Sequence, residues 1–167
     1  MTREQKHKNF YTTSVIIGLL LLMLEIGLYQ KTIIPIWVIL TVILISSTIT
    51  FFILRKDYQE TYLNKKIIYP IAQSVGSFGF ITCYLFMAIN FQFANKETTV
   101  KTVSIISKNT IGTKNPRPAI NIDYDGTVKQ IVFSSIDKSE VAAATAVILT
   151  VKKGFFGYDV LYGIQLK

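Results

Sequence analysis

The chain has 167 residues, of which 50% are hydrophobic and 17% are charged, and its net charge is +8. Because an ordinary soluble domain carries about 25% charged residues, this composition excludes a single water-soluble fold. Three long apolar runs fill residues 10–91, whereas residues 96–167 have the mixed composition of a water-soluble domain. We therefore predict a polar N-terminus at residues 1–9, a membrane region at 10–95 and a small domain at 96–167.

The apolar runs predict three transmembrane helices, at about residues 10–29, 33–54 and 67–91. Each has the roughly 20 residues that a helix needs to cross a hydrocarbon layer about 30 Å thick. The second and third runs each contain an early proline, Pro35 and Pro70. Proline is tolerated in the first helical turn, where its missing N–H is not needed, so both prolines indicate helix starts.

Glu25 is the one charged residue within the first run. An acidic residue at a helix centre costs about 2.5 to 3.5 kcal/mol on insertion, but about ten large apolar residues at roughly −0.3 to −0.6 kcal/mol each outweigh it. We expect an interfacial or protonated carboxyl group that packs against neighbouring helices. The alternative is a proton or cation relay site, since intramembrane carboxylates are often functional. The other two runs offer Glu25 no charged partner.

Small residues recur along the third run at Ala72, Gly76, Gly79 and Cys83, spaced four, three and four apart. In a regular helix this spacing puts them on one face, and small faces let helix backbones approach closely. We interpret the stripe as a helix-packing surface. The alternative is the lining of a pore.

Basic residues near the helix ends predict the orientation, because lysine and arginine collect on the cytoplasmic side. Seven flank one side, namely Arg3, Lys6, Lys8, Arg55, Lys56, Lys65 and Lys66, against Lys31, Lys96 and Lys101 on the other. We expect a cytoplasmic N-terminus and an extracytoplasmic C-terminal domain at the bacterial inner membrane. The N-terminal charges resemble the start of a signal peptide, but the apolar run is too long and lacks a cleavage site, so we expect a retained anchor. The positive charge is then a topology signal, and no motif predicts nucleic-acid binding.

The C-terminal domain alternates apolar and polar residues in several segments, most clearly at 158–166, which is typical of strands. Asp125 and Gly126 predict a tight hairpin turn, and Gly154 and Gly157 bracket a second one. Residues 134–145 predict a short helix with Ser135 as its cap. With a first strand at about 98–107, the order is β-β-β-α-β-β. This order predicts a small five-stranded OB-like β-barrel with one short helix.

Transmembrane helices followed by a small barrel are similar to the architecture of NfeD-like membrane proteins. The ending KKGFFGYDVL at residues 152–161 also resembles that of uncharacterised small bacterial membrane proteins. Both resemblances concern architecture. They imply no activity, cofactor or site residue for this chain.

Residues for catalysis or metal binding are scarce. His7 lies before the first run and Cys83 lies within the third, and they are the only histidine and cysteine. Metal sites and nucleophilic catalysis need several converging side chains. We therefore expect no enzyme activity, no metal and no cofactor.

The segment KKGFFG suggests a contact surface, because Lys152 and Lys153 precede Phe155 and Phe156 at an expected hairpin tip. Aromatic residues beside lysines can enter a headgroup layer or bind a partner. The alternative is that one phenyl ring fills the barrel core.

Two functions are consistent with these observations. The first is a non-catalytic interaction or accessory protein, with helices in a membrane assembly and a β domain that contacts a protein partner or a second copy. The second is a component of ion- or proton-coupled transport that uses Glu25. The lipid bilayer is a partner in both.

Overall fold

The computed structural model describes residues 2–63, 66–133 and 138–167 of the chain. The chain forms two compact units. The helical unit comprises Met1–Leu28 and Pro35–Ala88, and the sheet unit comprises Tyr29–Ile34 and Ile89–Lys167. The sheet unit thus includes the segment that joins the first two helices and the last residues of the third.

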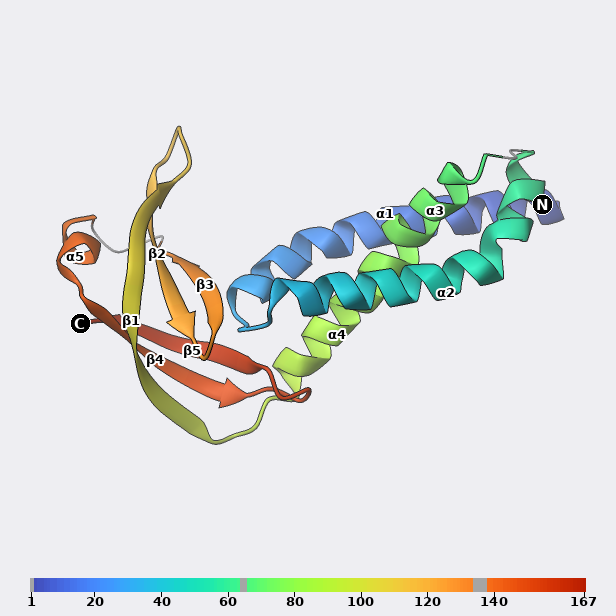
Figure 1. Ribbon diagram of the computed structural model, residues 1–167. Coiled ribbons are helices and arrows are strands. Elements are labelled where there is room, and N and C mark those ends of the chain that lie inside the picture. The colour runs from blue at the N-terminus through green and yellow to red at the C-terminus, as the bar shows by residue number, and fades with distance from the viewer. Residues whose placement is uncertain (1, 64–65, 134–137) are drawn as a thin grey trace. The chain divides into compact units, whose positions relative to one another are not determined.

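Three helices are long and apolar enough to cross a membrane, at Glu4–Gln30, Ile36–Tyr62 and Ile68–Gln92, which confirms the prediction of three long apolar helices. The first is α1 (Arg3–Gln30) and the second is α2 (Ile36–Tyr62) (Figure 1). Both extend past their apolar runs into polar sequence, because hydropathy marks only the apolar part of a helix. An ion pair between Lys8 and Glu4, at 2.5 Å, supports the added first turns of α1.

The third apolar helix consists of α3 (Ile68–Ser74), the π-helical segment η1 (Val75–Gly79) and α4 (Phe80–Gln92). A π-helix has a wider turn than an α-helix, so the 3.6-residue period does not continue across it. The predicted stripe of small residues runs through this π-helical segment.

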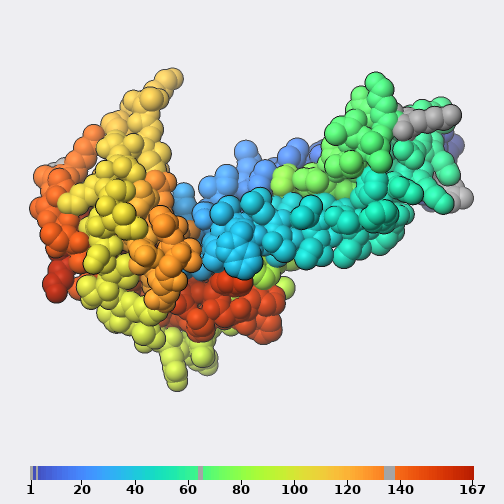
Figure 2. Space-filling model, in the orientation of Figure 1, coloured from blue at the N-terminus to red at the C-terminus, as the bar shows by residue number. Residues whose placement is uncertain are grey.

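The sheet unit contains β1 (Thr98–Ile111), β2 (Arg117–Tyr124), β3 (Thr127–Val132), α5 (Lys138–Ala143), β4 (Ala146–Lys153) and β5 (Asp159–Leu166). The strands form one antiparallel sheet in the order β3-β2-β1-β4-β5, curled into a half-barrel (Figure 1). The predicted order of five strands and one helix is confirmed. The β1–β2 turn projects beyond the rest of the sheet (Figure 2).

The turn chemistry at Asp125 and Gly126 is as predicted. These residues join β2 to β3 with φ values of 51° and 80°, the positive φ that a two-residue hairpin turn needs. Gly126 N also donates to Asp123 Oδ1 at 2.9 Å. The predicted cap Ser135 lies outside the described residues.

The core of the sheet unit is built from alternating strand residues. Ile120, Ile122, Val147 and Leu149 are all 0% exposed, and they pack in one cluster with Ile33 from the segment between α1 and α2. Register shifts in β1, between Ile105 and Ser107, and in the β4–β5 pair add the local bend that curling requires.

Candidate functional site

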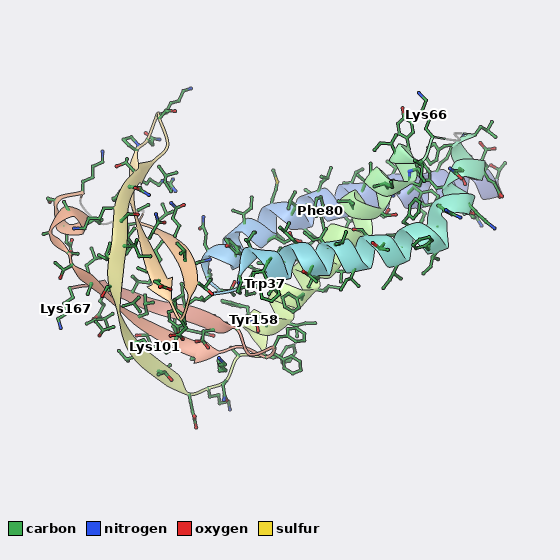
Figure 3. The ribbon with its side chains drawn as sticks, in the orientation of Figure 1. Trp37, Lys66, Phe80, Lys101, Tyr158 and Lys167 are labelled. Carbon is green, nitrogen blue, oxygen red and sulfur yellow. The ribbon has the colours of Figure 1, made fainter. Side chains whose placement is uncertain are left out.

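The turn between β4 and β5, Gly154–Tyr158, is held by one buried side chain. Asn90 is 0% exposed, and its Nδ2 donates to Tyr158 O at 3.1 Å while its Oδ1 accepts from Phe156 N at 3.0 Å. Asn90 O also accepts a bond from Phe155 N at 3.3 Å. A Cβ at Gly154 would overlap the Asn90 side chain. The turn is therefore fixed to the end of α4 (Figure 3, at Tyr158).

Three phenyl rings lie exposed at this turn, and we call them the aromatic surface: Phe93, Phe155 and Phe156, which are 65%, 62% and 43% exposed. The Phe155 ring centroid lies 6.2 Å from that of Phe93 and 5.0 Å from that of Phe156. None of the three belongs to the core cluster of the described residues. The aromatic surface is thus a continuous apolar patch on the sheet unit.

Lysines of the sheet unit lie beside other aromatic and acidic side chains of the same region. Lys152 Nζ lies 4.1 Å from the ring centroid of Tyr162, which stacks on Phe91, and Lys31 Nζ lies 6.0 Å from the Phe91 ring. Lys153 pairs with Asp159 at 3.2 Å. The structure therefore brings the predicted contact residues of the hairpin together and adds aromatic residues from the end of α4.

The segment Tyr29–Ile34, which comprises the last two residues of α1 and most of its connection to α2, contacts both edge strands of the half-barrel. Thr32 forms a β-bridge with Val160 of β5, and bonds of 2.7 and 2.8 Å join Ile33 N to Asp159 O and Leu161 N to Lys31 O. On β3, the ammonium group of Lys129 donates to Tyr29 O and lies 3.7 Å from the centroid of the Tyr29 ring. The segment thereby links the two edges that the half-barrel leaves apart.

Lys129 is the buried cation of this arrangement, with 2% exposure. Burial lowers the pKa of its ammonium group to about 8, because the charged form loses hydration. Sequence reasoning missed this lysine. Its position between Val128 and Ile131 on an alternating strand could have marked it as inward-facing, since residues 129 and 131 share a face.

Tyr124 connects the end of β2 to the start of β5. Its hydroxyl donates to Asp159 Oδ2 at 2.6 Å. Burial, together with this bond to a carboxylate, raises the pKa of Tyr124 to about 12. Lys101 on β1, labelled in Figure 3, has its Nζ 4.4 Å from the Tyr124 ring centroid and pairs with Asp125 at 2.7 Å. Hydrogen bonds to Asp125 and Tyr124 raise the pKa of Lys101. These contacts connect β1, β2 and β5.

Glu25 lies inside the helical unit, where it is 5% exposed. Its carboxyl group lies against the Cys83 thiol and the backbone of Tyr84. Within the described residues Oε1 has no hydrogen-bond partner. Glu25 is therefore enclosed by helices.

The predicted helix-packing residues differ in how far they are buried. Gly79 and Cys83 are buried, Gly76 is half-buried and Ala72 is exposed, and the π-helical turn lies within this stretch. A Cβ at Gly79 would lie 2.5 Å from Ser47 Oγ on α2. That all four form one packing surface stays a prediction.

Sequence reasoning missed the close packing of α1. Gly18 is buried, and a Cβ there would overlap Gly76 O and lie 3.0 Å from Ser77 Cα. The buried positions Tyr11, Ser14, Gly18 and Glu25 recur at three, four and seven residues, which is the spacing of one helix face. This helical spacing of small and polar residues in an apolar run could have predicted the packed face of α1.

A second polar cluster, also missed, joins α1 to α2 near the N-terminus. His7 Nδ1 lies 2.8 Å from Asp57 Oδ2, and the buried Tyr11 hydroxyl donates to the same oxygen at 2.5 Å. Gln73 Nε2 donates to Tyr11 O and Ser14 Oγ, both at 3.1 Å. His7 is thus a helix residue with a carboxylate partner, although its sequence context indicated only a polar tail.

In the part of the chain that the structure describes, no three His, Cys, Asp or Glu side chains come together as metal ligands. We find no match between this chain and any protein family, curated protein or solved structure compared with it. The functional argument therefore depends on this chain's own geometry.

Proposed function

We propose that the chain is a non-catalytic integral protein of the bacterial inner membrane, with an extracytoplasmic OB-like domain that contacts a partner. One observation carries the proposal. The segment Tyr29–Ile34 and the residues from Ile89 onward belong to the same compact unit as the sheet. Three crossings put the α1–α2 connection and the end of α4 on the same side of a membrane, so one folded domain can include both.

The topology of the sheet supports the OB-like part of the proposal. Five antiparallel strands in the order β3-β2-β1-β4-β5, with α5 between β3 and β4, agree with a partly open five-stranded barrel. Hydrogen bonds join residues 31 and 33 to β5 and Tyr29 to Lys129 of β3. In this proposal they close the gap between the two edge strands. In this proposal the domain is built around its membrane connection.

Cysteine labelling tests the orientation. Val128 is 66% exposed on β3, so Val128→Cys in a Cys83→Ser background supplies a single accessible thiol. A membrane-impermeant thiol reagent should label it in cells with a permeabilised outer envelope. Labelling that requires disruption of the inner membrane would place the sheet unit in the cytoplasm and reject the proposed orientation.

Cross-linking in intact membranes tests the interaction role. An accessory protein should give a discrete cross-linked species, either with a partner of defined mass or with a second copy. The matched control is the same chain after solubilisation in a harsh detergent, where the species should disappear. A chain that remains monomeric in membranes at its natural abundance would contradict the proposal.

Ion- or proton-coupled transport is the second candidate, because Glu25 is buried and its Oε1 has no partner among the described residues. Buried intramembrane carboxylates are expensive and often functional. Glu25→Gln removes the ionisable proton at nearly constant volume. Loss of cellular function at unchanged abundance would favour transport, whereas unchanged function would support the accessory role.

A further inference from the structure

We propose that the aromatic surface, Phe93, Phe155 and Phe156, lies in the headgroup layer of the bilayer that the chain's own helices cross. The β4–β5 turn is then a further membrane anchor of the sheet unit. This inference rests on the membrane insertion in the proposed function and names the bilayer, instead of a protein, as the occupant of the surface.

The covalent chain places the aromatic surface at the correct depth. Gln92 ends the third helix that is long and apolar enough to cross a membrane, and Phe93 is the next residue. A helix rises 1.5 Å per residue, so Phe93 lies within a few ångströms of the end of the apolar layer. Aromatic side chains are enriched at that level of membrane proteins.

The turn is tied to the same level as Phe93. Asn90 donates to and accepts from the backbone of residues 156 and 158 through its side chain, and Asn95 N donates to Lys153 O at 2.7 Å. The Phe155 ring contacts Phe93 directly, with centroids 6.2 Å apart. Because these contacts all lie within the sheet unit, Phe155 and Phe156 share the depth of Phe93.

The surrounding charges favour headgroups over a protein partner. Lys152 and Lys153 directly precede the turn that carries Phe155 and Phe156, and Lys96 follows Phe93 by three residues. Lys31 Nζ lies 6.0 Å from the Phe91 ring centroid, and Lys31, Lys96 and Lys153 are exposed. The centre of a protein interface is depleted of lysine, whereas a lipid surface accepts aromatic rings in the interface and attracts lysines through anionic headgroups. The acidic Asp159 nearby is held by Tyr124 and Lys153, so it leaves the positive charge dominant.

Tryptophan fluorescence tests the depth of the surface. The chain has one tryptophan, Trp37, so Trp37→Phe provides a silent background for Phe155→Trp. The matched control is Ile106→Trp, at a site of comparable exposure (56% against 62%) on β1, next to Ile105, which bonds Thr145 at the end of β4 away from the β4–β5 turn. The full-length proteins are reconstituted into vesicles of phosphatidylcholine and phosphatidylglycerol. Iodide is present on both sides of the membrane, so the direction of insertion does not affect the result.

We expect brominated acyl chains to quench Phe155→Trp several-fold more than Ile106→Trp, and iodide to quench it several-fold less. Equal quenching at the two positions would overturn the inference. Protection from both quenchers would also overturn it, because a protein would then cover the surface. Phe156→Trp repeats the test if the first variant does not keep the circular dichroism spectrum of the parent.

Alkaline extraction separates the two proposals. If the reconstituted chain remains in the vesicles but Phe155→Trp behaves like Ile106→Trp, only the anchoring inference fails. If the chain is extracted from the vesicles, membrane insertion fails and the anchoring inference fails with it. Vesicles of phosphatidylcholine alone should give weaker lipid quenching of Phe155→Trp, because the lysines then lose their anionic partners.

Discussion

In the helical unit many large apolar side chains are exposed and several small polar side chains are buried, whereas the core of the sheet unit consists of large apolar side chains. Large apolar residues of α1 and α2 are exposed, including Leu20, Leu24, Leu44, Phe52 and Ile53, at 56% to 69%. The buried polar residues of the helical unit include Ser14, Glu25, Ser47, Ser74 and Ser77. The sheet unit instead buries Ile120, Ile122 and Leu149 completely.

With the helices in a membrane, as proposed, the two units obtain their stability from different sources. Burial of apolar area, at about 25 cal/mol per Å², stabilises a fold only where the alternative environment is water. Burial of apolar area can therefore stabilise the core of the sheet unit. It cannot stabilise helices in lipid, so they depend on close backbone packing and on interhelical hydrogen bonds. Gly18 against Gly76, and Gln73 bonded to Ser14, are contacts of that kind.

The largest expected effect is the loss of helix packing in Gly18→Leu. The new side chain would collide with the backbone of Gly76 and Ser77, which cannot move as a flexible side chain does. We expect a destabilisation above about 4 kcal/mol, as for severe overpacking. The measurement is unfolding of the detergent-solubilised protein with increasing sodium dodecyl sulfate, followed by circular dichroism.

Gly27→Leu is the matched control for Gly18→Leu, since it lies on the same helix and a Cβ there meets nothing within 4 Å. Both substitutions remove a glycine from a helix, which by itself favours folding by up to about 1 kcal/mol. Equal behaviour of the two variants would show that α1 does not pack closely at Gly18.

Truncation of leucine to alanine should affect the two units unequally. Leu149→Ala leaves a cavity in the sheet core, where Leu149 is 0% exposed, and should cost about 2 to 5 kcal/mol. Leu24→Ala, at a site 56% exposed on α1, should change stability little, because lipid or detergent occupies the vacated volume. Thermal unfolding of both variants in the same detergent makes the comparison. A loss at Leu24 as large as at Leu149 would contradict the proposed lipid exposure of α1.

Local patterns predicted much of the fold. Hydropathy is sufficient for the three long helices, because their length and composition depend on each segment alone. The Asp125–Gly126 turn was predictable because positive φ is a property of those two residues. Alternation of apolar and polar residues likewise identified the strands.

The remaining features depend on partners distant in sequence. Asn90 meets Tyr158 across 68 positions, and Lys129 meets Tyr29 across 100. No local period indicates such pairs. A rule based on a regular helix also could not predict the π-helical turn at 75–79, so the spacing of the four small residues did not indicate that Gly79 and Cys83 are buried while Ala72 is exposed.

The buried Lys129 should make stability depend on pH. The folded chain releases its proton near pH 8, whereas an unfolded lysine keeps its proton to about pH 10.4. The unfolded state therefore binds more protons between these values, and stability rises with pH in that window. Between about pH 8 and pH 10 we expect a gain of about 2 kcal/mol, measured by thermal unfolding of the sheet unit within the full-length protein.

Lys129→Met is the control for this pH dependence, because methionine fills much of the same space without a charge. The variant should show no gain over the same window. Measurement stops at about pH 10, since Tyr124 is about half ionised in the unfolded chain at that pH and its further ionisation lowers stability. A wild-type curve that is flat from pH 8 to pH 10 would mean that Lys129 is hydrated in the folded protein.

The smallest expected effect concerns the ion pair of Lys101 and Asp125 on the surface of the sheet unit. Their side chains are 36% and 73% exposed, and exposed pairs contribute about 0 to 1 kcal/mol because water and salt screen them. Asp125→Asn removes the charge but keeps a residue that tolerates positive φ, so we expect a loss of at most about 0.5 kcal/mol that disappears at high salt.

Asp125→Ala separates charge from backbone strain at this turn. It removes the same carboxylate, but alanine pays about 1 kcal/mol or more to keep the φ of 51° that Asp125 adopts. Alanine should therefore be less stable than asparagine by about that amount, at low and high salt alike. Equal destabilisation of the two variants, disappearing at high salt, would contradict this prediction. It would mean that the ion pair, and not the backbone conformation of Asp125, stabilises the turn.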